Sequence, residues 1–189
     1  MNMKTGGFRI YIAGLFGALL ILTIMGVSWH SGPGTDEIRW NAEKKLCWED
    51  FKGNPDRESS KDALTESGIN FSWTCDRRGF KAEVFAIFVP SKSWVRTPTQ
   101  RLLRHEQTHF DITEIHARRI RKYFGDMRNP CWMGKEGINA AAKRMIQESY
   151  AMQRAYDSET KHSLREQEQV RWELMVKAEL ENLSAWAAP

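Results

Sequence analysis

The sequence predicts an α+β fold in which a small N-terminal β-sheet precedes packed helices. Residues 69–74 and 80–89 are rich in β-branched and aromatic side chains, and a turn-like segment at residues 76–79 separates them. Residues 99–124 and 138–183 contain neither glycine nor proline, and helix formers dominate both stretches. A hydrophobic content of 41% and a charged content of 28% are ordinary for a folded protein. We therefore expect one domain at residues 40–185, with the last stretch broken into two helices near residues 157–160.

The first thirty residues predict a membrane anchor or an export signal. Lys4 and Arg9 precede an uncharged stretch whose apolar centre, residues 10–27, is longer than the ~7–15 residues of a signal-peptide core. These positive charges, with Asp36 and Glu37 downstream, predict that the rest of the chain is exported to the cell envelope or periplasm. We favour a retained transmembrane helix within residues 1–30 over a cleaved signal, followed by a linker at residues 31–39.

Cysteine content and charge are consistent with an exported protein that does not bind nucleic acid. Cys47, Cys75 and Cys131 all lie in the expected exported part, which allows one disulfide and one free thiol, although the sequence does not select the pair. The formal net charge is +4, but basic residues alternate with acidic ones along the predicted helices. This pattern is typical of solvated helix faces, and no nucleic-acid-binding motif accompanies it.

The segment at residues 105–109, HEQTH, predicts a catalytic zinc site. On a helix each residue advances by about 100° and 1.5 Å, so His105 and His109 share one face and lie about 6 Å apart along the axis. Two imidazoles at this spacing can bind one ion, and Glu106 can reach a metal-bound water as a general base. The same spacing places this segment on the apolar face of the helix, with the following residues on the opposite face: Arg104, Asp111, Glu114, Arg118 and Lys122.

A catalytic zinc usually needs a third protein ligand. His116 lies seven residues after His109, so an unbroken helix carries it about 10 Å away, and we interpret it as a structural or surface residue. His30 belongs to the predicted anchor. The remaining candidates for the third ligand are His162, Asp157, Glu159 and Glu166.

Several blocks of the sequence resemble a bacterial family of uncharacterised exported proteins that are predicted to be zinc-dependent peptidases. The longest is LLRHEQTHFDITEIHARRIRKYF at residues 102–124. Others are WEDFKG at 48–53, ALTESGI at 63–69, SW at 93–94 and YDSETKHS at 156–163, followed by Gln167 and Trp172. The resemblance covers roughly residues 40–180 and implies a zincin-like fold.

This resemblance implies roles for individual residues in the closing block. It makes His162 the preferred third zinc ligand over Asp157 or a glutamate, and Tyr156 a candidate to stabilise the oxyanion. The family often has glycine at the position of Ser163, where serine can follow the same backbone unless a positive φ is required. Asp111 belongs to the matching run but faces away from the metal, so we expect it to pair with an arginine.

Together these observations predict an exported zinc metallopeptidase that acts on a peptide or protein substrate. In this interpretation His105, His109 and His162 bind Zn²⁺, and Glu106 is the general base for the zinc-activated water. The alternative is a non-catalytic envelope binding protein with a structural or vestigial metal site. An open coordination position favours the enzyme, whereas a site closed by four protein ligands favours the alternative.

Overall fold

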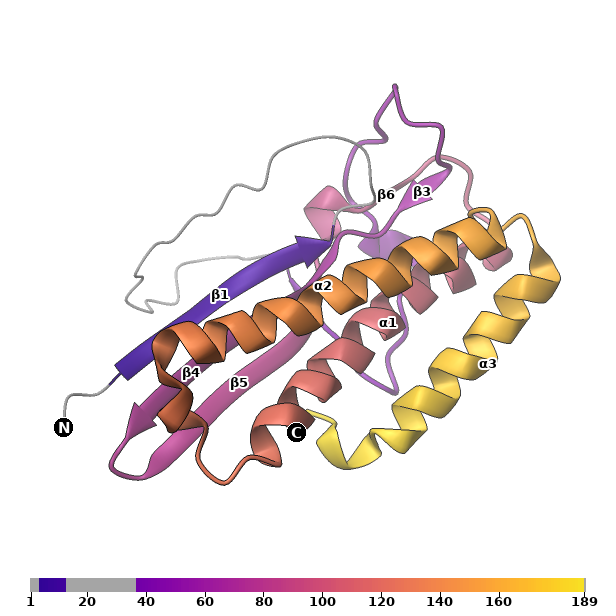
Figure 1. Ribbon diagram of the computed structural model, residues 1–189. Helices are drawn as coiled ribbons and strands as arrows, with labels where there is room; N and C mark the ends of the chain where they lie inside the picture. Colours follow the sequence, from indigo (N-terminus) through magenta and orange to yellow (C-terminus); the bar gives the residue numbers. More distant parts are fainter. Residues whose placement is uncertain (1–3, 13–36, 189) are drawn as a thin grey trace.

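The computed structural model describes residues 4–12 and 37–188 and confirms the α+β class (Figure 1). A four-stranded antiparallel sheet has the order β1-β4-β5-β2. Its strands are β1 (Lys4–Ile12), β2 (Ile38–Arg39), β4 (Ser67–Asp76) and β5 (Gly79–Phe88). A separate two-stranded ladder joins β3 (Ala63–Leu64) to β6 (Trp94–Val95), and β3 contacts the first long helix.

The central hairpin forms where the sequence predicts it. β4 and β5 pair from Ser67 opposite Phe88 to Asp76 opposite Gly79. Alternate side chains along β4 point into the core, because successive residues of a strand face opposite sides of a sheet. Gly79 has a φ of +107°, a conformation that glycine adopts without steric cost, and it closes the tight turn between the strands.

Three helices follow the sheet: α1 (Gln100–Gly125), α2 (Gly134–Thr160) and α3 (Glu166–Asn182). Thr99 caps α1, since its hydroxyl accepts a hydrogen bond from the backbone N–H of Leu102 at 3.2 Å. Short 3₁₀ helices lie between and after these elements: η1 (Trp48–Asp50), η2 (Pro90–Lys92), η3 (Pro130–Met133) and η4 (Ser184–Trp186). The break predicted near residues 157–160 is confirmed, since α2 ends at Thr160 and α3 begins at Glu166.

α1 packs across β4 and β5, α2 packs on β1 and α1, and α3 covers the remaining side of α1 (Figure 1). The main core lies between the sheet and the first two helices, and a second apolar cluster lies among the three helices. The prediction that Glu114 and Arg118 face solvent is wrong. Both are buried, because the C-terminal helix covers that face: Arg118 donates to Glu114 at 2.9 Å and to the backbone oxygen of Leu180 at 2.7 Å.

The predicted membrane anchor lies mostly outside the described residues. Of its residues 1–30, the described part, 4–12, is strand β1 and not a helix, and Arg9 in this strand pairs with Glu37 at 2.9 Å. Residues 13–36, which hold the rest of the predicted span and most of the linker, are not described. Within the ranges that are described, no helix is both long and apolar enough to cross a bilayer.

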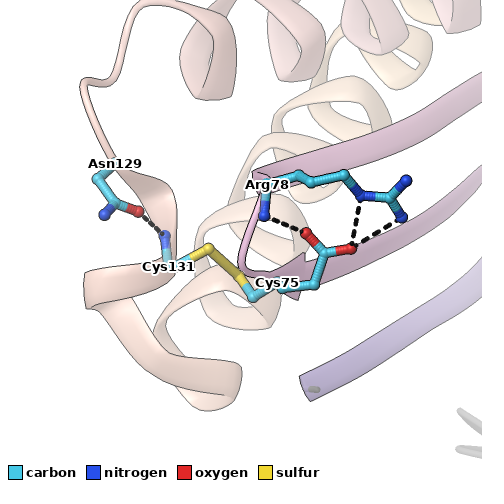
Figure 2. The surroundings of a disulfide bond; sticks show 5 residues. Cys75, Arg78, Asn129 and Cys131 are labelled. Atoms are coloured by element: carbon cyan, nitrogen blue, oxygen red, sulfur yellow. Dashed lines mark hydrogen bonds and ion pairs between the residues drawn. A yellow bond between two sulfur atoms is a disulfide. The ribbon is translucent and has the colours of Figure 1, made fainter. Parts of the chain in front are cut away.

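A disulfide joins Cys75 at the end of β4 to Cys131 in η3 (Figure 2). Cys47 is free and exposed. The Asn129 side chain accepts a hydrogen bond from the backbone N–H of Cys131 at 3.1 Å and so orders the bridged turn. This confirms the expectation of one disulfide and one free thiol and identifies the pair. A disulfide of this kind is typical of proteins outside the cytoplasm.

Removing this disulfide is expected to lower the free energy of unfolding by about 2–4 kcal/mol, because the bridge constrains the unfolded chain across a separation of 56 residues. The measurement is denaturant unfolding of the double variant Cys75→Ala/Cys131→Ala against the oxidised wild type. Cys47→Ala is the control and should unfold at the wild-type midpoint. Equal midpoints for the double variant and the wild type would contradict the pairing.

Candidate metal centre

The two motif histidines lie on the buried face of α1, as the helical spacing predicts. The His105 side chain is 2% exposed and that of His109 is 14% exposed. Their rings are nearly perpendicular, with centroids 4.8 Å apart, and the two Nε2 atoms are 3.2 Å apart. Both histidines therefore direct the same ring nitrogen toward one point.

Asp157, near the end of α2, supplies the group at that point. Its Oδ1 lies 3.1 Å from His105 Nε2 and 2.9 Å from His109 Nε2. Ligand atoms about 2.0–2.1 Å from a tetrahedral zinc ion are about 3.3 Å from one another. The three separations of 2.9–3.2 Å are therefore close to those of a zinc ligand set.

His162 is the fourth candidate ligand. Its Nδ1 lies 3.2 Å from Asp157 Oδ1, and its side chain is 54% exposed. His105, Asp157 and His162 form a group whose ligand atoms all lie within 4.8 Å of one another and could hold a metal ion. The structure thus brings all three sequence-predicted histidines together and places Asp157 among them.

The histidines around Asp157 favour the ionised form of its carboxyl group. Burial alone would raise the pKa of Asp157, but the charge of His109 and hydrogen bonds from the three histidines outweigh it and hold that pKa far below its usual range. Burial alone would lower the pKa of His109, yet the charges of Asp157 and Glu106 raise it above its ordinary value. Burial lowers the pKa of His105.

Gln153, one turn before Asp157 on α2, sets which nitrogen of His109 faces the centre. Its amide nitrogen donates to the backbone oxygen of His109 at 2.8 Å and to Thr113 Oγ1 at 3.2 Å. Its Oε1 therefore accepts the hydrogen bond from His109 Nδ1, which leaves Nε2 for a metal. His105 differs, because its buried Nδ1 has no hydrogen-bond partner among the described residues.

Glu106 is also buried, at 3% exposure, and lies close to the histidines. Its negative charge acts on the pKa values of His105, His109 and Tyr156, so its carboxylate belongs to the same electrostatic environment. Its backbone oxygen accepts a hydrogen bond from Thr65 at 3.4 Å, which links the motif to the segment after β3. This location suits a base that serves the metal centre.

Tyr156 forms one wall of the centre. Its ring stacks on His105 with centroids 4.5 Å apart and meets the edge of His109 at 5.0 Å. The side chain is fully buried, and its hydroxyl donates to the backbone oxygen of His105 at 3.4 Å. This orientation supports a role in positioning the two imidazoles, and the oxyanion role expected for Tyr156 stays a prediction.

The turn that carries His162 has an unusual backbone. Lys161, His162 and Ser163 have φ values of 48°, 52° and 75°, all in the left-handed region that non-glycine residues avoid. The position of Ser163 therefore does have the positive φ that favours glycine. Three consecutive residues of this kind beside a candidate metal centre indicate that strain is retained where it orients a side chain.

Replacing Ser163 with glycine is expected to raise the free energy of unfolding by about 1 kcal/mol, since glycine adopts positive φ without steric cost. Ser158→Gly is the matched control. Ser158 is exposed within α2, so glycine there should lower stability by roughly 0.5–1 kcal/mol. Denaturant unfolding of both variants measures the difference, and a Ser163→Gly protein destabilised as much as the control would contradict the strained turn.

The other ligand candidates are engaged elsewhere. Glu159 accepts hydrogen bonds from Trp172 Nε1 at 2.8 Å and from Arg171, and Glu166 pairs with Arg104 at 2.6 Å. His116 is buried, and burial together with the charge of Arg119 lowers its pKa to about 3, so it is a neutral structural residue.

The expected pairing of Asp111 with an arginine is wrong. Asp111 accepts hydrogen bonds from Trp40 Nε1 at 2.6 Å and Gln107 Nε2 at 2.7 Å, and Lys45 lies 3.4 Å away. The reason is that the segment after β2 crosses this face of α1 and brings Trp40 and Lys45 to the carboxylate. Asp111 thus fastens that segment to the motif helix.

The structure is that of an α+β protein with a histidine and aspartate group that could hold a metal ion. Its disulfide is typical of proteins outside the cytoplasm. A family model described as "Bacterial protein of unknown function (DUF922)" matches residues 90–163, a range that contains every residue of this group. The similarity to a bacterial family of unknown function is therefore confirmed over this range, and the matching description names no peptidase activity. No curated protein and no solved structure shows significant similarity to the chain.

Proposed function

We propose that the protein is an exported zinc-dependent hydrolase that cleaves amide bonds in peptides or proteins. The observation that supports this most directly is the convergence of His105 Nε2, His109 Nε2 and Asp157 Oδ1 within 3.2 Å of one another. Glu106 lies on α1, the helix that carries both histidines. Two histidines and one carboxylate are the ligand set of several catalytic zinc sites. The disulfide supports a location outside the cytoplasm.

In this proposal His105, His109 and Asp157 hold the ion, and His162 lies beside them. A bound zinc ion supplies Lewis acidity and lowers the pKa of a coordinated water. Glu106 accepts a proton from the attacking water and passes it to the amine that leaves when the C–N bond breaks. Tyr156 and Gln153 keep the imidazoles in place, because one stacks on His105 and the other holds the Nδ1 proton of His109.

The test uses a peptide library of diverse sequence, with products identified by mass spectrometry. The oxidised, zinc-loaded protein should cleave a subset of peptides, a chelator should abolish cleavage, and added zinc should restore it. If the protein carried stoichiometric zinc but cleaved no peptide in the library, this result would contradict the proposal that it is a hydrolase.

A second candidate is a non-catalytic protein whose metal site is closed by four protein ligands. The position of His162, 3.2 Å from Asp157 Oδ1, favours it. Adding acetohydroxamate to the cobalt-substituted protein distinguishes the hydrolase from the non-catalytic protein. An open position binds the added ligand and changes the cobalt absorption spectrum, whereas a closed site leaves the spectrum unchanged.

A further inference from the structure

Lys61 contacts the side of Asp157 that faces away from the histidines. Its Nζ lies 3.1 Å from Asp157 Oδ2, whereas Oδ1 is the oxygen that faces the imidazole nitrogens. The two side chains are only 18% and 19% exposed, so this is a partly buried ion pair. Each oxygen of the central carboxylate therefore has its own, chemically different partners.

The backbone around Lys61 is held in place, which distinguishes it from an ordinary surface lysine. The Lys61 N–H donates to Ser59 Oγ at 3.2 Å, and its carbonyl accepts from Arg96 Nη1 at 2.7 Å. The Arg96 N–H in turn donates to the Asp62 carbonyl at 2.7 Å, and its guanidinium lies over the Trp94 ring at 5.3 Å. These contacts fasten the loop before β3 to β6 and fix the direction from which the ammonium approaches.

We propose that Lys61 is a positioning residue that commits Asp157 to the metal through Oδ1 alone. This inference rests on the proposed function and concerns how the same site keeps a position open. An aspartate can bind a cation through one oxygen or through both. Because Lys61 occupies Oδ2, the carboxylate takes one coordination position and leaves room for water.

The positive charge of Lys61 indicates that this residue orients the Asp157 carboxylate and does not increase the affinity for the metal ion. An ammonium group and a divalent metal ion repel each other, so Lys61 does not act by strengthening metal binding. Its contribution is to hold the carboxylate in one orientation. The informative measurement is therefore the coordination of the metal, with affinity as a secondary readout.

The experiment compares the cobalt absorption spectra of the wild type, Lys61→Met and Lys61→Arg in the full oxidised protein. Cobalt in a four-coordinate site absorbs strongly, and a higher coordination number weakens the bands. We expect Lys61→Met to show weaker bands as both Asp157 oxygens bind, and Lys61→Arg to keep the wild-type spectrum. Lys177→Met is the control, since Lys177 is exposed on α3, and it should match the wild type.

A Lys61→Met spectrum that superimposes on the wild-type spectrum would overturn the inference and leave the proposed function standing. A wild-type protein that binds neither cobalt nor zinc would overturn the proposed function itself. Thermal unfolding followed by circular dichroism establishes that each variant is folded before its spectrum is compared. Should Lys61→Met not fold, Lys61→Leu also removes both the charge and the hydrogen-bond donor, and a wild-type-like spectrum of that variant would count equally against the inference.

Discussion

Replacing Asp157 with asparagine is expected to lower the affinity for Zn²⁺ by roughly 100-fold or more, because changing even an outer partner of a ligand costs about 10–100-fold. The variant keeps the shape of the side chain but removes the negative charge that faces His105 and His109 at 3.1 and 2.9 Å. Isothermal titration of the metal-free protein with zinc measures the change.

Asp62→Asn is the matched control for this substitution, since Asp62 is exposed and the same change removes the same charge. It should bind zinc as the wild type does. The parallel variant His162→Ala shows how much the exposed histidine contributes. If Asp157→Asn bound zinc with wild-type affinity, Asp157 would not be a ligand. The ligands would then be His105, His109 and His162.

Replacing Glu106 with glutamine is expected to reduce peptide hydrolysis by about 10²–10⁴-fold, the range that general bases contribute. Glutamine has nearly the same shape but cannot accept the proton of the attacking water. The substitution leaves the proposed ligands in place, so the variant should still bind one zinc ion per chain. Initial rates on a cleaved peptide, measured beside zinc content, give both quantities.

Glu148→Gln serves as the control for Glu106→Gln, because Glu148 is an exposed glutamate on α2. Its rate should equal that of the wild type. A Glu106→Gln protein that keeps both zinc and the full hydrolysis rate would show that another group accepts the proton. Loss of both zinc and activity would instead show that Glu106 is needed for zinc binding.

The elements that local pattern determines could be predicted from the sequence. The β4–β5 hairpin follows from alternating apolar residues around a glycine turn, and α1 follows from a long stretch without glycine or proline that ends at Gly125. The convergence of His105 and His109 follows from the same helical spacing. The burial of Glu114 was missed, because it depends on the later helix α3, which covers that face of α1.

The rest of the site depends on contacts between distant segments, which no spacing rule supplies. The sequence leaves Asp157 as an alternative to His162 for the third ligand, because which of them meets the two motif histidines depends on how α2 packs along α1. Lys61 and Gln153 carry no motif of their own, and their contacts span 96 and 44 residues. One available signal for Gln153 was its position four residues before Asp157, one helical turn away on the same face of α2.

The most direct test of the metal centre is a crystal structure of the zinc-loaded, oxidised protein with anomalous diffraction data at the zinc absorption edge. We predict a single strong peak about 2.0–2.2 Å from His105 Nε2, His109 Nε2 and Asp157 Oδ1. The same map shows whether His162 or a water molecule completes the coordination. The absence of a peak between these three atoms, in crystals that contain zinc, would contradict the account.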